Sequence, residues 1–384
     1  MAQLKKTCLP LPNRIDAENA NQVLQDLSNA ISGKDFDELT LDAANLTYVS
    51  SAGLRVFLTI KKKFAPGLKL INVSREVYEI LEVTGFSQML NVQKKMREFS
   101  VEGREVIGKG YCGTVYRIDP ETIIKVYRDS TEETLADIEN EKKMATLALV
   151  NGIPTAISYD VVKVGNSYGS IFELLNAVTF NDLVIKEPER VDEITKQYAG
   201  FLKVIHETEI DDPLLPSAKK KFLGYLDFLT PFVDADLLGK LRAFLDAMKD
   251  SHTVVHGDPQ MKNIMLVNGE PMLIDMDTLC AGDPLFDLQA IYVTYVAYSE
   301  DEPGNSMSFL GIPQKIAARI WEKVLEYSLE GLSPNEKEAT ITKTLILAYV
   351  RFLYLITSST DVTSPLSQLR ILHGTEKLRG LLGE

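Results

Sequence analysis

The chain has 384 residues, of which 45% are hydrophobic and 25% charged, which is the composition of a globular protein with room for two or three domains. Its three cysteines and four histidines are scattered, so neither a disulfide framework nor a zinc site is expected. No run approaches the apolar length that spans a bilayer, and the N-terminus lacks the apolar segment of a signal peptide, so we expect a cytoplasmic protein.

The net charge of −13 is unevenly distributed along the chain. Residues 1–98 hold 13 basic and 11 acidic side chains, whereas the remainder holds 28 and 43. An acidic second region argues against nucleic acid or an anionic membrane as a partner. It would suit a cationic substrate, although an acidic surface that only maintains solubility is the commoner explanation.

The first 92 residues alternate short apolar strands with helical patterns. Such an alternation predicts a small mixed sheet with helices packed on it. A polar stretch follows and is expected to be a linker. The predicted helices lie at 18–32, 51–63 and 75–83, and the predicted strands at 38–43 and 67–73.

A different pattern begins near residue 101. Short β-like runs come first, and after residue 180 the chain reads mostly as helix. We therefore expect a small β-rich lobe followed by a larger helical lobe. The predicted elements of the first lobe are strands at 101–108, 113–118 and 122–128, a helix at 131–150, and two strands that flank Gly165.

A glycine-rich run lies between the first two of these strands. Gly108, Gly110, Gly113 and Val115 match the pattern G-x-G-x-x-G-x-V. Because the run joins two strands and not a strand to a helix, it is not a dinucleotide fingerprint. Glycines let backbone N–H groups approach phosphates closely. Lys125, flanked by apolar residues in the next strand, is placed to reach the α- and β-phosphates of ATP.

An acidic partner for Lys125 is expected on the helix that follows. We favour Glu141, with Glu139 as the alternative. Such an ion pair would hold the lysine in place.

The most informative stretch is 254–277. Asn263 lies five positions after Asp258, the spacing of a kinase catalytic loop, and an apolar hairpin then leads to Asp275. Asp258 can accept the proton of an attacking hydroxyl, and the other two side chains offer hard oxygen ligands for Mg²⁺. The stretch therefore predicts phosphoryl transfer from ATP.

Several neighbouring residues have simpler interpretations. An aspartate before a proline can serve only to cap a turn, which is the alternative for Asp258. Asp277 is a second metal ligand or a cap, and His256 is a support for the loop in preference to a base. Lys262 contacts the γ-phosphate or is an ordinary loop lysine.

These motifs resemble the aminoglycoside/choline kinase branch of the protein-kinase-like superfamily. The match covers roughly residues 100–384 and rests on H-G-D at 256–258, I-D-M-D at 274–277 and G-D-P-L-F-D-L at 282–288. The D-F-G and A-P-E motifs of protein kinases are absent. The resemblance implies a bilobal kinase-like domain over 105–384, with an N-lobe at 105–175 and a C-lobe from 176.

The same resemblance implies roles for individual residues. Lys125 would bind phosphates, Asp258 would be the base, and Asn263 and Asp275 would hold Mg²⁺. Backbone groups of 172–176, a segment that includes Glu173 and Leu175, would read adenine. Among the acidic residues of the second region, Asp283 and Asp287 could favour a cationic acceptor, although Asp287 fits better as an anchor for the catalytic loop.

The first region resembles the STAS domain of anti-sigma factor antagonists. The match is at 41–58 and 68–86, which gives a domain over 1–95 and a linker over 96–104. Ser51 aligns with the phosphorylated serine of that family, and Ser50 replaces the usual aspartate. A helix N-terminus favours an anion, which fits such a role. The alternative is that Ser51 is only an N-cap.

We thus expect a two-domain α+β and α/β protein that transfers the γ-phosphoryl group of ATP, with Mg²⁺, to a small hydroxyl compound. A second hypothesis is a signalling protein whose kinase domain phosphorylates Ser51 or a STAS serine of another chain, with an anti-sigma-type partner. A third is a nucleotide sensor without catalysis. A homodimer is compatible with each of them.

Overall fold

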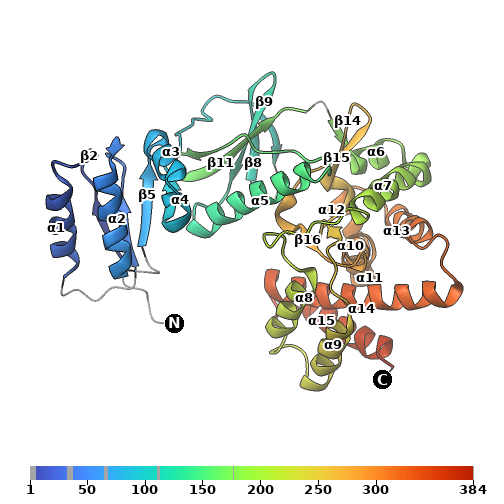
Figure 1. Ribbon diagram of the computed structural model, residues 1–384. Helices are drawn as coiled ribbons and strands as arrows, with labels where there is room; N and C mark the ends of the chain where they lie inside the picture. Colours follow the sequence, from blue (N-terminus) through green and yellow to red (C-terminus); the bar gives the residue numbers. More distant parts are fainter. Residues whose placement is uncertain (1–5, 33–37, 65–67, 110–112, 176, 384) are drawn as a thin grey trace. The chain divides into compact units, whose positions relative to one another are not determined.

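Figure 1 shows the computed structural model, which describes residues 6–32, 38–64, 68–109, 113–175 and 177–383. By its contacts the chain divides into two compact units. They are Met1–Ser100 with Val162–Gly165, and Val101–Val161 with Asn166–Glu384.

The first unit is built on a sheet of four parallel strands in the order β1-β3-β5-β6. Helices connect successive strands, and parallel pairing requires such crossovers. Alternation in β3 buries Leu39 and Leu41, and helical spacing in α3 buries Val77 and Leu81. The elements are β1 (Lys6–Pro10), β2 (Arg14–Ile15), α1 (Ala20–Ile31), β3 (Glu38–Asp42), β4 (Tyr48–Val49), α2 (Ser51–Phe64), β5 (Leu68–Val73), α3 (Arg75–Val83), α4 (Phe86–Met89) and β6 (Asn91–Lys94).

A five-stranded sheet in the order β10-β11-β9-β8-β7 follows. The strands β7, β8 and β9 pair antiparallel, a short turn joins β8 to β9, and Val115 lies opposite Lys125 in the register. Thr131 caps the helix after β9 by accepting a hydrogen bond from the backbone N–H of Thr134. The elements are β7 (Val106–Lys109), β8 (Gly113–Asp119), β9 (Thr122–Tyr127), α5 (Glu132–Val150), β10 (Asp160–Val164) and β11 (Ser167–Glu173).

The rest of the chain is mainly helical and packs around one large apolar core. Its β-structure is confined to short strands that frame the catalytic stretch. The first part comprises β12 (Ala177–Thr179), α6 (Phe180–Lys186), η1 (Pro188–Arg190), α7 (Val191–His206), α8 (Ala218–Phe228), α9 (Ala235–Ala247), β13 (Val254–Val255), η2 (Met261–Asn263), β14 (Ile264–Val267), β15 (Glu270–Leu273), η3 (Met276–Thr278) and β16 (Cys280–Ala281). The second comprises α10 (Leu285–Tyr292), the π-helical turn η4 (Val293–Ala297), α11 (Tyr298–Asp301), α12 (Asn305–Leu310), α13 (Gln314–Ser328), α14 (Pro334–Ser359) and α15 (Pro365–Leu381).

The expectation that no segment is long and apolar enough to cross a membrane was wrong. By length and composition alone, α14 passes that test, with a mean hydropathy of 1.5 over its most apolar window. Half of that window is buried inside the protein, and Figure 1 shows α14 running through the helical part beside α10 and α15. A central core helix must be apolar on most sides, so it passes the same test.

Two domains of the expected kinds are therefore present. The first has a sheet covered by helices, and the second has a β-rich lobe followed by a helical lobe. The fold class expected from the sequence is confirmed.

Candidate active site

The catalytic loop joins β13 to η2 and carries Asp258. Gln260 Nε2 donates to Oδ2 of Asp258 at 2.9 Å, and Asn263 Nδ2 lies 3.3 Å from the same oxygen. Asn263 Nδ2 also donates to the backbone carbonyl of Asp258 at 3.0 Å. Both of these contacts use the amide nitrogen of Asn263, which leaves its Oδ1 available as an acceptor or metal ligand.

Asp275 follows β15 and is held in the left-handed backbone region, with φ +64°. A non-glycine residue in that region is strained, and such strain concentrates at functional sites. Its carboxylate lies 3.4 Å from Nζ of Lys125, which comes from β9. Glu141 on α5 lies 4.0 Å from the same nitrogen. Residues from three separate elements thus meet around one ammonium group.

Burial and crowding by acids raise two pKa values here. The pKa of Glu141 is raised mainly by burial, although Lys125 opposes the shift. The pKa of Asp277 rises to about 7, first because it is buried and then because Asp275 and Glu141 are nearby. A surplus of negative charge of this kind favours the binding of a cation.

The donor set fits Mg²⁺ bound together with a nucleotide. Among the described residues there is no cluster of three or more His, Cys, Asp or Glu side chains that could hold a metal ion. Mg²⁺ in phosphoryl-transfer sites uses one or two protein oxygens and completes its shell with phosphates and water. Oδ1 of Asn263 and the carboxylate of Asp275, 41% exposed, supply that number.

A buried carboxylate fixes the catalytic loop from behind. Asp287, fully buried at the start of α10, accepts hydrogen bonds from the backbone N–H groups of His256 at 3.0 Å and Gly257 at 2.7 Å. His206 Nε2 lies 2.8 Å from its Oδ2. Burial by itself raises the pKa of Asp287, but these hydrogen bonds and the charge of His206 bring it below its ordinary value. Ionised Asp287 is therefore a fixed acceptor for the loop.

Further contacts complete this support. His256 is buried, accepts from the backbone N–H of Asp258 at Nδ1 (3.3 Å), and so donates from Nε2 to the carbonyl of Ile274 (3.2 Å). The π-helical turn η4 brings the hydroxyl of Tyr295 within 3.0 Å of the backbone N–H of Met261. The Tyr198 hydroxyl donates to the carbonyl of Pro259.

Two family models match the chain, one for each domain. The model of a family described as a phosphotransferase enzyme family matches residues 104–306, which is more than half of the chain. The chain belongs to this family. It is a kinase-type phosphotransferase with a hydroxyl group as acceptor. The STAS domain model matches residues 2–99, so the phosphotransferase carries a STAS domain.

Solved structures show the same fold at low sequence identity. A thermostable mutant of aminoglycoside phosphotransferase APH(4)-Ia in its apo form is 12% identical, with a TM-score of 0.51 over 74% of this chain and 96% of that one. A ternary complex of a mutant of the same enzyme with AMP-PNP and hygromycin B is 12% identical, with a TM-score of 0.51 over 73% and 93%. The search of curated proteins found no match.

The glycine-rich loop of the phosphotransferase lies at the junction of β7 and β8. Gly110 lies outside the described residues. A Cβ at Gly113 would come within 2.1 Å of the Val126 carbonyl oxygen, so only glycine fits there. Gly108 has ordinary space around it, with Val115 as its nearest neighbour at 3.7 Å.

The segment expected to read adenine begins at the end of β11. Glu173 is exposed there and accepts from the Tyr159 hydroxyl at 3.2 Å, and Leu175 is half-buried. The remaining residue of this segment, at 176, lies outside the described part of the chain.

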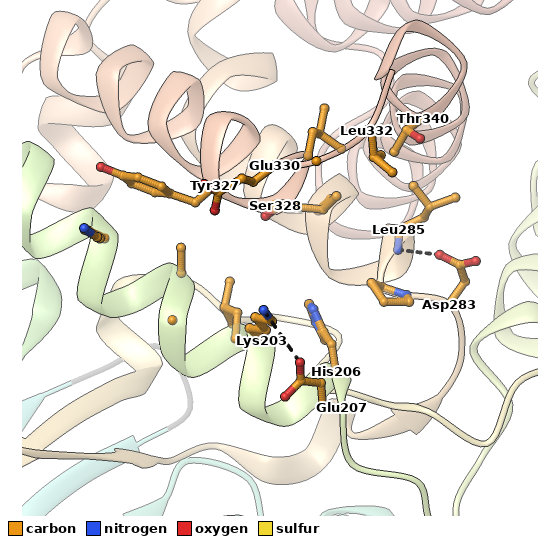
Figure 2. Close-up of a pocket in the computed structure, with 18 residues that line it drawn as sticks. Lys203, His206, Glu207, Asp283, Leu285, Tyr327, Ser328, Glu330, Leu332 and Thr340 are labelled. Carbon is orange, nitrogen blue, oxygen red and sulfur yellow. Dashed lines mark hydrogen bonds and ion pairs between the residues drawn. The ribbon is translucent and has the colours of Figure 1, made fainter. Parts of the chain in front are cut away.

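The two aspartates that could have favoured a cationic acceptor, Asp283 and Asp287, do not lie beside Asp258 in position to contact an acceptor. Asp287 is sealed beneath the catalytic loop. Asp283 accepts from the backbone N–H of Leu285 at 3.0 Å and lines a cavity of about 540 Å³ (Figure 2). Figure 2 shows this cavity between α7 and the segment around Tyr327, and its described lining includes His206, Asp283 and Leu285 but neither Asp258 nor Asn263.

Several residues that contribute to the site were not predicted from the sequence. Tyr127 holds Glu141 through its hydroxyl at 3.2 Å, and His206 pairs with Asp287. Arg351 on α14 donates to the carbonyl of Gly257 and lies 3.6 Å from Oδ1 of Asp258. Arg351 did carry a sequence signal, because it is the one charged residue in 344–359. A lone charge in an apolar helix does not predict that Arg351 lies close to Asp258, 93 positions earlier in the chain.

In the STAS domain the two adjacent serines have different roles. Ser50 precedes α2, and its Oγ accepts from the backbone N–H of Ala52 at 3.2 Å. Its carbonyl accepts the first helical bond, from Leu54. Ser50 is therefore the N-cap. Ser51 is exposed on the first turn, and its hydroxyl makes no hydrogen bond within the described part of the chain.

Proposed function

We propose that this phosphotransferase transfers the γ-phosphoryl group of ATP, with Mg²⁺, to a hydroxyl acceptor beside Asp258. The observation that carries the proposal is the meeting of Lys125, Glu141 and Asp275 from three elements, next to a loop that bears Asp258 and Asn263. We infer that the reaction takes place in the cytoplasm, where ATP and Mg²⁺ are available.

Each residue has a defined task in this reaction. Asp258 accepts the proton of the acceptor hydroxyl while that oxygen bonds to the γ-phosphorus and the bond to the bridging oxygen of ADP breaks. Lys125 binds the α- and β-phosphates, and Glu141 holds Lys125 in position. Asn263 and Asp275 would hold Mg²⁺, which offsets the charge that develops on the phosphates.

The test is ATP turnover by the full chain with an Asp258→Asn variant. Loss of the base should lower turnover by about 10²- to 10⁴-fold while nucleotide binding persists. Asp137→Asn, an exposed aspartate on α5, is the matched control and should behave as wild type. Unchanged turnover in Asp258→Asn contradicts the proposal. Nucleotide binding without turnover in the wild type would favour a sensor instead.

A second candidate acceptor is Ser51 of this or another STAS domain, with an anti-sigma-type partner responding to its state. The observation in its favour is that Ser50 performs the capping, which leaves the Ser51 hydroxyl exposed at a helix N-terminus. There the positive end of the helix dipole stabilises a phosphate. Incubation with labelled ATP should label the wild type and Ser50→Ala but not Ser51→Ala. Equal labelling of Ser51→Ala excludes this acceptor.

A further inference from the structure

The wall beside Asp258 is formed in part by α8 and α14, and it carries two cations. Arg351 of α14 binds the Gly257 carbonyl through Nη1, and its Nη2 lies 3.6 Å from Asp258. Lys221 of α8 lines the same small void as Arg351 and Gly257. The charge of Lys221 also acts on Asp277 and, together with that of Arg351, on Cys280.

Neither helix supplies an acid to balance these cations. The one acid of α8, Asp227, is engaged with Arg242 of α9 at 2.5 Å. Residues 344–359 of α14 contain no acid. Lys221 is exposed and makes no ion pair within the described part of the chain. Arg351 has one carbonyl contact and one longer carboxylate contact, so donors of its five-donor guanidinium remain available.

The same wall carries a platform of aromatic rings. Tyr225 of α8 and Tyr354 of α14 stack with centroids 3.9 Å apart and planes 18° from parallel. Phe228 packs edge-on against Tyr354 at 5.3 Å and is 43% exposed. Lys221, Tyr225 and Phe228 follow at helical spacing on one face of α8. A cationic edge beside aromatic faces suits a ligand with a negative group and a carbon skeleton.

We propose that the acceptor is an alcohol that also bears an anionic group, a carboxylate or a phosphate ester, bound by Lys221 and Arg351. This inference rests on the proposed function and names the acceptor class for the same site. It differs from the cationic substrate that the net charge of −13 would suit, which was the less common of the two explanations for that charge. The net charge of a protein determines its electrostatic potential at long range. The groups that contact a ligand determine which ligand is bound.

The full chain is incubated with Mg²⁺, with ATP that carries a labelled γ-phosphate, and with a small-molecule extract. Ion exchange has first separated this extract into cationic, neutral and anionic fractions. A labelled small-molecule product from the anionic fraction is the expected result, and its sensitivity to phosphatase-pretreated extract separates phosphate esters from carboxylates. A product from the cationic or neutral fraction alone overturns the inference, as does label that enters only protein. ADP release is followed in parallel, and its absence under all conditions would instead remove the proposed function.

Variants of α8 then test the wall itself. Lys221→Met should raise the KM for the anionic acceptor about 10- to 100-fold, with the KM for ATP within about twofold of wild type. Lys221→Glu should shift preference toward cationic alcohols. Lys220→Met, which removes the adjacent exposed lysine of the same helix, is the matched control and should match wild type. A rise in the KM for ATP would show that Lys221 serves the nucleotide, and it would contradict the inference.

Discussion

Nζ of Lys125 lies 3.4 Å from Oδ1 of Asp275, nearer than the 4.0 Å that separates it from Oε1 of Glu141. The lysine thus links the β-rich lobe to the residue that follows the β14–β15 hairpin. Its side chain is 23% exposed, so its interaction with these acids is only partly screened by water. Nucleotide and metal would compete for the same groups.

Replacement of Lys125 by methionine should impair the reaction more than the fold. Loss of a cation at the phosphates is expected to lower kcat/KM for ATP by about 10²-fold. Steady-state ADP release at varied ATP measures this. Lys143→Met, an exposed lysine on α5, should leave kcat/KM unchanged. Equal kcat/KM for Lys125→Met and Lys143→Met would show that Lys125 does not bind phosphate.

The glycine-rich loop allows a matched comparison of two glycines. Gly113→Ala should lower the free energy of unfolding by about 1–3 kcal/mol, because the Val126 carbonyl lies 2.1 Å from the new Cβ and backbone cannot easily give way. Gly108→Ala meets only Val115 at 3.7 Å and should cost less than about 1 kcal/mol. Thermal unfolding compares the two. Equal shifts in Tm would contradict the steric argument.

The anchor of the catalytic loop should be sensitive to pH. Asp287→Asn removes a buried acceptor of three hydrogen bonds and should cost about 3–5 kcal/mol at pH 7. Because the pKa of Asp287 is below its ordinary value of 3.8, the stabilisation by its ionised form is present above that pH and lost as pH falls through the lower, folded-state value. The free energies of unfolding of wild type and variant, measured in urea, should therefore converge as the pH falls through the folded-state pKa of Asp287. A difference that is constant with pH would contradict the assignment.

Alanine variants of the two STAS-domain serines should differ in their effect on the stability of the protein. Ser50→Ala removes the N-cap of α2 and should cost about 1 kcal/mol of stability. Ser51→Ala removes an exposed hydroxyl and should change stability by less than about 0.5 kcal/mol. Thermal unfolding tests both. A larger loss in Ser51→Ala would mean that any loss of label there reflects unfolding.

The sequence was sufficient for much of the architecture because local patterns carry it. Helical and alternating spacing placed five elements of the first domain to within a few residues, as for α3 at Arg75–Val83, whereas β1, β2, β4, α4 and β6 were not predicted. The order Asp258, Asn263, Asp275 and the glycine run predicted the kinase-type domain. These signals are short-range, and backbone propensity and amphipathic spacing express them directly.

Only the tertiary structure brought together residues far apart in the chain. Arg351 meets Asp258, His206 meets Asp287, and Lys221 shares a void with Arg351. Charge counts along the sequence were compatible with a cationic substrate, although a surface that maintains solubility was the commoner explanation. They did not indicate that packing would seal Asp287 inside and place Arg351 and Lys221 by the catalytic loop. Spacing along the chain indicates on which face of its own helix or strand a residue lies. The neighbouring element against which that face packs is decided by how the helices pack together, and that depends on contacts between residues distant in the chain.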